Sequence, residues 1–349
     1  MRNTDAWPAD RIRDIEQLED MLSRPSDGVI ETLGRLDGDI IVLGAGGKVG
    51  PSLARMAKRA LDSAGVGRRI IGVDVFPSAD QESKLQAAGV ETLKADLLDP
   101  DQLQGLPDAA NVVFMVGMKF GSTGQESLTW AMNAFLPGMV AHKYRNSRIV
   151  AFSTGNVYGL TPVTLGGSIE TDPPDPAGEY AMSALGRERV LEHFSRTLDI
   201  PMALIRLNYA VETRYGVLVD LAQKVFAGET IDVTMGNANV IWQGDAVAMT
   251  LRAFDCVASP PFVLNVAGPE TVSIRRAAEQ FGRLMDKPVS FSGAESPDAL
   301  LSNGRLGHTL FGYPEVGLEQ MMVWVADWVM RGGESLGKPT HFESRDGRF

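Results

Sequence analysis

A strand, a glycine-rich turn and a helix follow one another in "DIIVLGAGGKVGPSLARMAKRALDSA", residues 39–64, and this order limits the possible fold strongly. Gly44, Gly47 and Gly50 stand at G-x-x-G-x-x-G spacing, where a β-branched apolar run gives way to helical spacing. Glycine here lets the backbone turn tightly and approach a pyrophosphate, which free N–H groups at the helix N-terminus stabilise. A plain tight turn would show the same glycines, so the surrounding sequence has to decide.

Short apolar runs and helical segments alternate over the next 150 residues. Strands are predicted at 39–44, 69–75, 90–96, 111–117, 148–154 and 201–208, and the main helices between them at 48–64, 83–89, about 126–145 and around Tyr180. Strands that are covered on both faces have such continuous β-branched runs. The alternation predicts an α/β fold, a doubly wound parallel sheet of the Rossmann type.

The rest of the chain has shorter elements. Helices are predicted at 216–228, 244–255, 273–286 and 318–330, and a strand at 262–268. We therefore expect four parts: an N-terminal helical extension (1–37, with a helix over 10–23), the dinucleotide-binding domain (38–208), a small α/β substrate lobe (209–332) and a loosely held tail (333–349). The lobe should cover the carboxyl edge of the sheet, where such folds bind ligands.

The composition argues against several classes of binding partner. A formal net charge of −11 argues against nucleic acid and anionic membrane surfaces. The single cysteine, Cys256, and the lack of a Cys/His cluster predict neither a disulfide nor a metal site. No run of about 18 apolar residues occurs, so we expect a cytoplasmic protein.

Acidic residues follow the second and third predicted strands. Asp74 ends "IIGVD", where a carboxylate accepts hydrogen bonds from both hydroxyls of an adenosine ribose and repels a 2′-phosphate. Asp96 and Leu97 end the third strand in "KADLLD". Together with the glycine turn, these residues favour NAD over NADP as the cofactor.

With these motifs the chain resembles the extended short-chain dehydrogenase/reductase family, the NAD-dependent epimerases/dehydratases, from about residue 38 to 331. The resemblance implies a cofactor site along the ends of the first four strands. "VVFMVGMK" looks like the family's fourth strand, whose end lines the cofactor. The implied NAD-binding residues are Gly44, Gly47, Lys48, Val49, Gly50, Asp74, Asp96, Leu97, Met115, Val116, Gly117, Lys119, Asn133, Tyr180 and Leu207.

The resemblance also implies the catalytic groups. "FSTGNVYG" makes Thr154 the match to the family's catalytic Ser/Thr, whose hydroxyl bonds the reacting oxygen, and Tyr180 in "GEYAMSALGRER" matches the catalytic tyrosine. The family's tyrosine is followed, four residues on, by a lysine that lowers the phenol pKa and holds the nicotinamide ribose. Here that position is Ala184.

Three explanations for Ala184 remain open. The positive nicotinamide ring lowers the Tyr180 pKa unaided; or Lys119 supplies the missing charge as a third catalytic residue; or catalysis is lost and NAD is a structural or sensing ligand. Arg187 shares the helix face with Tyr180 but lies two turns away, and we expect it to form a structural ion pair.

The substrate is less well defined. Nucleotide-sugar enzymes of the family carry an Arg shortly before an Asp in the small lobe, whereas "GNANVIWQGDAV" has Asp245 without that Arg. Asn156, Asn208, Tyr209 and Trp242 are the predicted contacts to a polyhydroxylated small molecule: a sugar, polyol or sugar acid. Arg206, Arg214 or Arg305 would meet a carboxylate, although each is more typical of a structural residue.

The predicted function is therefore hydride transfer at a carbinol carbon, as oxidoreductase or epimerase. Dehydration ranks lower, because Gly155 and Asn156 follow Thr154 where dehydratases often have an acid. The alternative is a catalytically silent NAD-binding regulator or scaffold. The resemblance further implies a homodimer through two helices per subunit. Residues 128–144 are a candidate for one of them, although their methionines are equally consistent with internal core.

Overall fold

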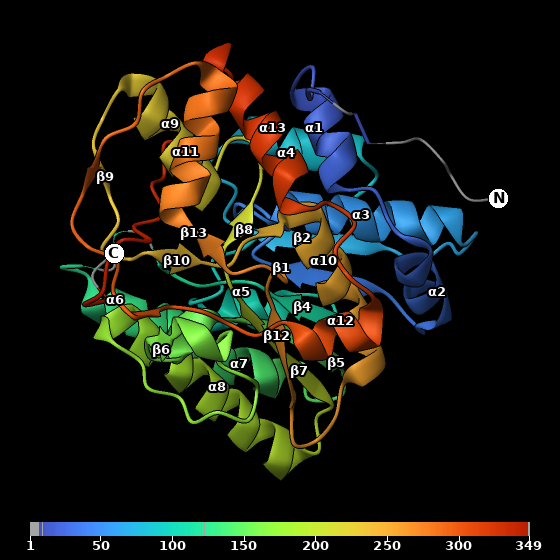
Figure 1. Cartoon of the computed structure of the whole chain (residues 1–349). Coiled ribbons are helices and arrows are strands. Elements are labelled where there is room, and N and C mark those ends of the chain that lie inside the picture. Colours follow the sequence, from blue (N-terminus) through green and yellow to red (C-terminus); the bar gives the residue numbers. More distant parts are fainter. Residues whose placement is uncertain (1–6, 9, 120, 122, 348–349) are drawn as a thin grey trace.

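A parallel sheet forms the centre of the molecule (Figure 1). The computed structural model describes residues 7–8, 10–119, 121 and 123–347, and within them this sheet has seven strands. In spatial order they are β12 (Phe262–Val266), β7 (Met202–Leu207), β5 (Arg148–Thr154), β4 (Asn111–Phe114), β1 (Ile40–Leu43), β2 (Ile70–Asp74) and β3 (Glu91–Lys94). The order turns back between β1 and β4, which opens a crevice at their carboxyl ends. The predicted doubly wound α/β fold is confirmed.

Alternate residues of β1 face opposite sides of the sheet, which explains its unbroken apolar sequence. Ile40 and Val42 pack in one core cluster with α3, while Ile41 and Leu43 pack in another with α7 and α8. The helices in this half of the chain are α3 (Gly50–Ser63), α4 (Ala79–Ala87), α5 (Pro100–Gly105), α6 (Glu126–Trp130), a π-helical turn (Ala131–Phe135), α7 (Leu136–Lys143) and α8 (Gly178–Leu198).

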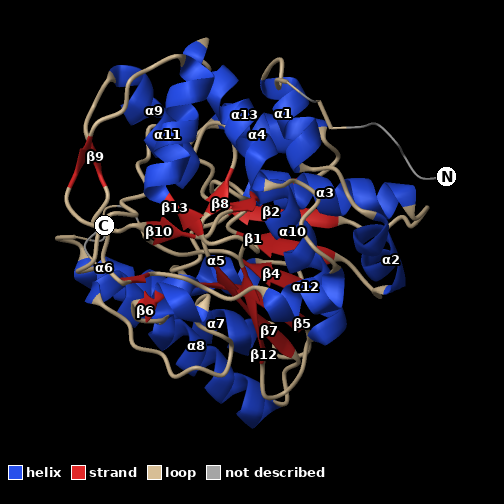
Figure 2. Ribbon diagram, in the orientation of Figure 1, coloured by secondary structure: helices blue, strands red, loops and turns tan. Residues whose placement is uncertain are grey.

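A second group of helices gathers at the other end of the view from α7 and α8 (Figures 1 and 2). It consists of α9 (Val217–Ala227), α11 (Ile274–Met285) and α13 (Leu318–Met330), which pack on one another. Two-stranded pairings stiffen the loops around it: β6 (Thr161–Pro162) with β15 (Asp298–Ala299), β8 (Ala210–Val211) with β11 (Ile241–Trp242), β9 (Ile231–Asp232) with β14 (Phe291–Ser292), and β10 (Asn237–Ala238) with β13 (Val272–Ser273).

The boundary predicted at residue 208 does not separate the two halves cleanly. β12, which we assigned to the small lobe, pairs in parallel with β7 as an edge strand of the main sheet. Helix α10 (Gln243–Arg252) likewise packs on α3, and α12 (Arg305–Phe311) packs on β12. The chain therefore crosses from sheet to lobe more than once.

The N-terminal extension contains two helices where we predicted one. α1 (Ile15–Leu22) is capped by Asp14 and packs in the core of the lobe, whereas α2 (Asp27–Arg35) is capped by Ser26 and packs against α3 and α10. Residues 1–6 and 9 of the predicted extension lie outside the described residues. The extension thus joins the lobe to the sheet layer.

The C-terminal segment is docked, so the expectation of a loosely held tail was wrong. Thr340 donates from its backbone N–H and its hydroxyl to Asp220 of α9, at 2.8 and 2.6 Å, and Phe342 is fully buried in the lobe core. The segment then reaches the start of α8, where a Cβ on Gly178 would clash with the backbone of Gly347. In the described residues, no helix is both long and apolar enough to cross a membrane.

Candidate active site

The glycine turn after β1 is shaped by close backbone contacts. Gly44 has φ of +94°, and a Cβ there would lie 3.0 Å from the backbone nitrogen of Val116 at the end of β4. A Cβ on Gly50 would lie 2.6 Å from the carbonyl oxygens of both Gly44 and Ala45. Around Gly47, by contrast, a Cβ would meet only the Gly44 carbonyl, at 3.4 Å. The backbone is therefore crowded around Gly44 and Gly50, whereas Gly47 has space beside it. A turn that binds a phosphate needs both features.

Helix α3 begins at this turn without a capping side chain. Its N-cap, Val49, has helical backbone angles and makes no side-chain cap, and Pro51 occupies the first turn. The free N–H groups and the positive end of the helix dipole favour an anion at this place.

Asp74 is held beside the turn. One carboxylate oxygen accepts from the backbone nitrogen of Gly46 at 3.0 Å, and the other accepts from that of Phe76 at 3.4 Å. Asp96, shortly after β3, accepts from the backbone nitrogen of Leu98 at 3.0 Å. Both carboxylates are thus oriented by backbone donors at the carboxyl edge of the sheet.

One cavity of about 240 Å³ collects most of the predicted cofactor residues. It is lined by Gly44, Gly47, Asp74, Asp96, Leu97, Met115, Val116 and Gly117, together with Val75, Ala95, Leu98, Met132 and Leu136, which the sequence analysis missed. Acidic groups, glycine backbone and apolar walls fit the ribose, phosphate and adenine of a dinucleotide. The missed residues are ordinary aliphatic side chains, so no sequence signal distinguishes them from core.

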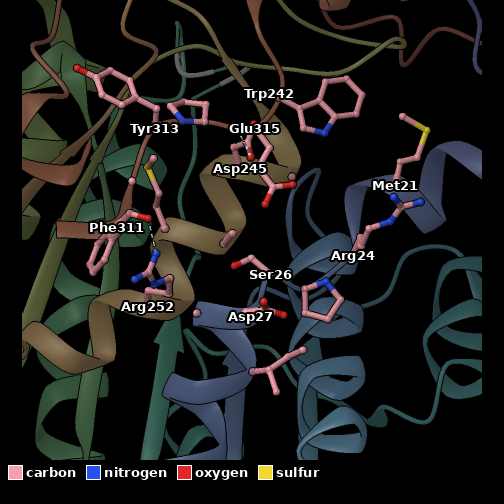
Figure 3. Close-up of a pocket in the computed structure, with 18 of the residues that line it drawn as sticks. Met21, Arg24, Ser26, Asp27, Trp242, Asp245, Arg252, Phe311, Tyr313 and Glu315 are labelled. Atoms are coloured by element: carbon pink, nitrogen blue, oxygen red, sulfur yellow. Dashed lines mark hydrogen bonds between the residues drawn. The ribbon is translucent and has the colours of Figure 1, made fainter. Parts of the chain in front are cut away.

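A larger cavity, of about 780 Å³, lies elsewhere, between the N-terminal extension and α10 (Figure 3). Of the predicted site residues only Trp242 lines it. Trp242 is 1% exposed and packs edge-on against Trp324 of α13, with ring centroids 5.2 Å apart. This burial in the lobe core removes Trp242 from the contacts that we propose to substrate.

Thr154 and Tyr180 come together where β5 ends and α8 begins. Their side chains are hydrogen bonded, and Thr154 also accepts from the backbone nitrogen and the side-chain amide of Asn156, at 3.2 and 2.9 Å. Burial raises the pKa of Tyr180, while the bond to Thr154 and the charge of Arg187 oppose this shift. The neighbouring strand end places Leu207 in register with Thr154.

Asn133 ties the end of β4 to α8. It is fully buried in the π-helical turn, and its Oδ1 accepts from the backbone nitrogen of Met118 at 2.8 Å. Its Nδ2 donates to the Met118 carbonyl and to the Ser183 hydroxyl, both at 2.9 Å. The side chain therefore positions the segment that borders the cofactor cavity.

Both predicted lysines lie near tyrosines of this site. Lys119 Nζ is 5.8 Å from the ring centroid of Tyr180, and burial lowers the pKa of Lys119 to about 8. Lys48 Nζ is 3.2 Å from the centroid of Tyr215, and burial, reinforced by Lys119, lowers the pKa of Lys48 to about 7 although Glu212 opposes it.

The remaining predicted contacts are mostly structural. Asn208 is buried and donates to Asn239 Oδ1 at 2.9 Å. Arg206 pairs with Glu188 at 2.7 Å, and Arg214 pairs with Glu19 at 2.8 Å and with Glu212.

Tyr209 and Arg187 differ from these. Tyr209 has φ of +43°, and burial raises its pKa. Arg187 was expected to form an ion pair, but in the described part of the chain it pairs with no carboxylate. The described residues also contain no cluster of three or more His, Cys, Asp or Glu that would hold a metal.

Solved structures with the same fold include three sugar-nucleotide enzymes. The chain is similar to a UDP-glucuronic acid 4-epimerase from Bacillus cereus in complex with NAD (17% identity, TM-score 0.67) and to a UDP-glucose 4-epimerase with UDP-glucose from Thermotoga maritima (16%, 0.69). A UDP-glucose 4-epimerase from Thermus thermophilus in complex with NAD is similar too (18%, 0.66). Each match covers 84% of this chain and 99% of the other.

No curated protein sequence matches the chain. A family model does: that of the NAD dependent epimerase/dehydratase family matches residues 40–234, from β1 through α8 into the lobe. The matched region is more than half of the 349 residues and contains the glycine turn, Thr154 and Tyr180. The chain therefore belongs to the NAD dependent epimerase/dehydratase family, whose cofactor is NAD.

Proposed function

We propose that the protein transfers hydride between NAD and a carbinol carbon of a small sugar, polyol or sugar acid, as an oxidoreductase or epimerase. The observation that carries the proposal is the hydrogen-bonded pair of Thr154 and Tyr180 at the carboxyl end of β5. This pair supports the proposal, because it would combine a proton acceptor and a hydroxyl donor at the carboxyl edge of the sheet, where such folds bind their ligands.

The residues divide the work as follows. The chemistry that bound NAD would supply is a hydride acceptor. The Tyr180 oxygen takes the proton from the substrate hydroxyl, because a phenolate is the base in its reach. The Thr154 hydroxyl bonds the same substrate oxygen, and Asn156 orients Thr154 through the bonds to Oγ1. The N–H groups of the turn at Gly47 and of the first turn of α3 would hold the pyrophosphate.

Two lysines favour a substrate that carries an anionic group. Lys48 and Lys119 lie close enough for the charge of Lys119 to disfavour ionisation of Lys48, and a carboxylate between them would relieve that repulsion. A UDP-sugar fits less well, because Asn239, in the segment before Asp245, is buried in bonds to Asn208 and to the backbone of Ser302. Within this class we therefore favour a sugar acid.

Ala184 favours the second candidate, a silent NAD-binding protein, because no lysine stands one turn after Tyr180. The two candidates differ in whether a substrate hydride ever leaves its carbon. A substrate deuterated at the carbinol carbon reports this for a dehydrogenase and for an epimerase alike, since the label either appears on NAD or changes its stereochemical position.

In the test, the protein and NAD⁺ are incubated with deuterated sugars, polyols, sugar acids and UDP-sugars. The deuterium label is followed by NMR, and reduced nicotinamide is followed by its near-ultraviolet absorbance. Tyr180→Phe should lose label transfer while keeping NAD affinity by calorimetry. Tyr313→Phe, which changes a highly exposed tyrosine outside the site, is the matched control. Transfer that persists in Tyr180→Phe, or NAD binding without transfer from any substrate, would contradict the proposal.

A further inference from the structure

Tyr180 needs a positive charge near its oxygen to work as a base. An ordinary phenol has a pKa of about 10, so that about one in a thousand is ionised at neutral pH, and burial moves the pKa of Tyr180 further up. The residue at position 184 is an alanine and has no charge. Its side chain is 2% exposed and packs against Val157 and Tyr158.

Arg187 brings a guanidinium to this place from the same helix. It lies two helical turns after Tyr180, and it is 6% exposed. Nη1 donates to the Phe152 carbonyl of β5 at 2.7 Å, and Nη2 donates to Asn133 Oδ1 at 2.8 Å. The group is therefore fixed between the end of β5 and the π-helical turn.

Gly117, at the end of β4, makes room for this guanidinium. A Cβ on Gly117 would lie 2.4 Å from Nη2 of Arg187. Gly117 also lines the cofactor cavity, so the guanidinium contacts a residue of the cavity wall that has no side chain.

Arg187 forms no ion pair with a carboxylate in the described part of the chain, although the charge of the adjacent Glu188 favours its protonated form. The acceptors are neutral, namely the carbonyls of Phe152 and Asn133 and the amide of Asn133. Glu188, the adjacent residue on α8, is already bonded to Arg206 and to Ser153. A buried charge without a partner ion is costly, so its retention calls for another reason.

Two N–H groups of Arg187 remain for a ligand. A guanidinium has five, and the bonds above use three, while no acceptor among the described residues takes the others. Among the described residues, the titratable groups that interact with Tyr180 include Arg187 on its own helix, Lys119 after β4 and Tyr215 after β8. Among these, Arg187 is the one whose charge opposes the upward shift of the Tyr180 pKa.

We propose that Arg187 is a positioning residue that supplies the positive charge for the Tyr180 phenolate, in place of a lysine at position 184. The inference rests on the proposed function. Its consequence for pH follows from the sign of the interaction: the cation favours ionised Tyr180, so its removal moves ionisation to higher pH. An opposite charge that interacts with a phenol commonly lowers its pKa by about one unit or more, which is about tenfold in the ionised fraction.

The first test needs no substrate. Ultraviolet titration of tyrosinate, with the Tyr180→Phe spectrum subtracted, gives the midpoint of Tyr180 alone. Arg187→Gln should raise this midpoint by about one unit or more, whereas Arg189→Gln should not, because Arg189 is an exposed residue of the same helix that pairs with Glu192. An unchanged midpoint in Arg187→Gln, or an equal shift in Arg189→Gln, overturns the inference even if the protein proves to be an enzyme.

Two further variants complete the test. Arg187→Gln/Ala184→Lys returns a cation to the helix one turn from Tyr180 and should bring the midpoint back. Where a substrate is found, hydride transfer in Arg187→Gln should fall about tenfold at neutral pH and recover as pH rises. If Arg187→Gln does not fold, Asn133→Asp decides instead, since a carboxylate at Oδ1 neutralises the guanidinium where it lies; an unchanged Tyr180 midpoint in that variant overturns the inference.

Discussion

Lys48 shows how one residue of the glycine turn links the cofactor site to the lobe. Its ammonium group lies over the ring of Tyr215, and the acids around it, Glu212 and Asp220, only partly offset the cost of burial. A charge that the folded state disfavours lowers stability at every pH at which the unfolded chain would hold the proton.

Lys48→Met should therefore stabilise the protein, and the gain should depend on pH. The Lys48 pKa falls from 10.5 in the unfolded chain to about 7 in the fold, so the folded state binds fewer protons between these values. Wild-type stability rises with pH across that window. The advantage of the variant is consequently greatest below about pH 7 and fades toward pH 10.5, by about 1.4 kcal/mol per pH unit at most.

Urea unfolding of both proteins at several pH values measures this difference. Lys58→Met is the control, because Lys58 lies in a surface i,i+4 pair with Asp62 on α3. A gain for Lys48→Met that is the same at all pH values would mean that packing, not charge, is responsible.

Sequence patterns grouped those predicted site residues that lie in the glycine turn or at a strand end. Gly44, Gly47 and Asp74 are such residues, and they line one cavity. Trp242 and Arg187 were misread, because their surroundings come from distant elements: α13 contacts Trp242, and β4 and β5 contact Arg187. The spacing of residues along the sequence does not show which side chains from distant elements contact one another.

At the scale of elements, a buried polar group joins α8 to two strands behind the active site. Glu188 of α8 accepts from Ser153 of β5 at 2.5 Å and from Arg206 of β7 at 3.0 and 2.7 Å. Arg206 also donates to the Tyr158 hydroxyl at 2.7 Å. Since Thr154 and Tyr180 stand on β5 and α8, this group sets the distance between them.

Arg206→Met should lower the free energy of unfolding by about 3–5 kcal/mol, because it leaves the Glu188 carboxylate buried without its partner ion. The double variant Glu188→Gln/Arg206→Met removes both charges and should recover part of that loss. Arg196→Met, which breaks an exposed pair with Glu192, should cost no more than about 1 kcal/mol. Urea denaturation measures all three, and equal losses in the single and double variants would refute the argument.

Helices and strands were predicted correctly where a hydrophobic pattern within the segment defines them. The prediction failed where the place of an element depends on pairing with a strand distant in the sequence. The six strands predicted up to residue 208 are all in the sheet. β12 has the same apolar signature, but its pairing with β7 joins residues about 60 positions apart, and the sequence does not state which strand it joins. The short α2 was missed because Pro25 and Gly28 resemble a turn, although Ser26 caps the helix.

At the scale of the whole molecule, the described parts of both terminal segments pack on the lobe. Trp324 of α13 donates to the Pro8 carbonyl at 2.8 Å, and Arg331 donates to the Arg13 carbonyl at 2.7 Å. Phe342 and α1 belong to the same core cluster as α9 and α11. Composition described the terminal segments as polar, but a few buried apolar side chains are enough to dock them.

A face formed by α6, the π-helical turn and α8 leaves large apolar side chains in solvent. They are Leu128, Trp130, Phe135 and Met182. Single exposed apolar residues are ordinary, but a group on adjacent helices marks an interaction surface. This face is consistent with the homodimer that the family resemblance led us to expect, which stays a prediction. Trp130 also donates to Glu179, the residue before Tyr180, at 2.6 Å, so a partner on this face would steady the start of α8.

Phe135→Glu tests the dimer, because Phe135 is 64% exposed and would be central to a helix–helix contact. Burying a charge in an apolar interface is costly, so the variant should sediment as a monomer where the wild type sediments as a dimer. Leu165→Glu is the matched control: Leu165 is 69% exposed on a 3-10 turn outside this face, and the variant should remain dimeric. A monomeric wild type, or a Phe135→Glu dimer, would show that this face has another role. Loss of the dimer together with weaker hydride transfer would link assembly to α8, the helix that carries Tyr180.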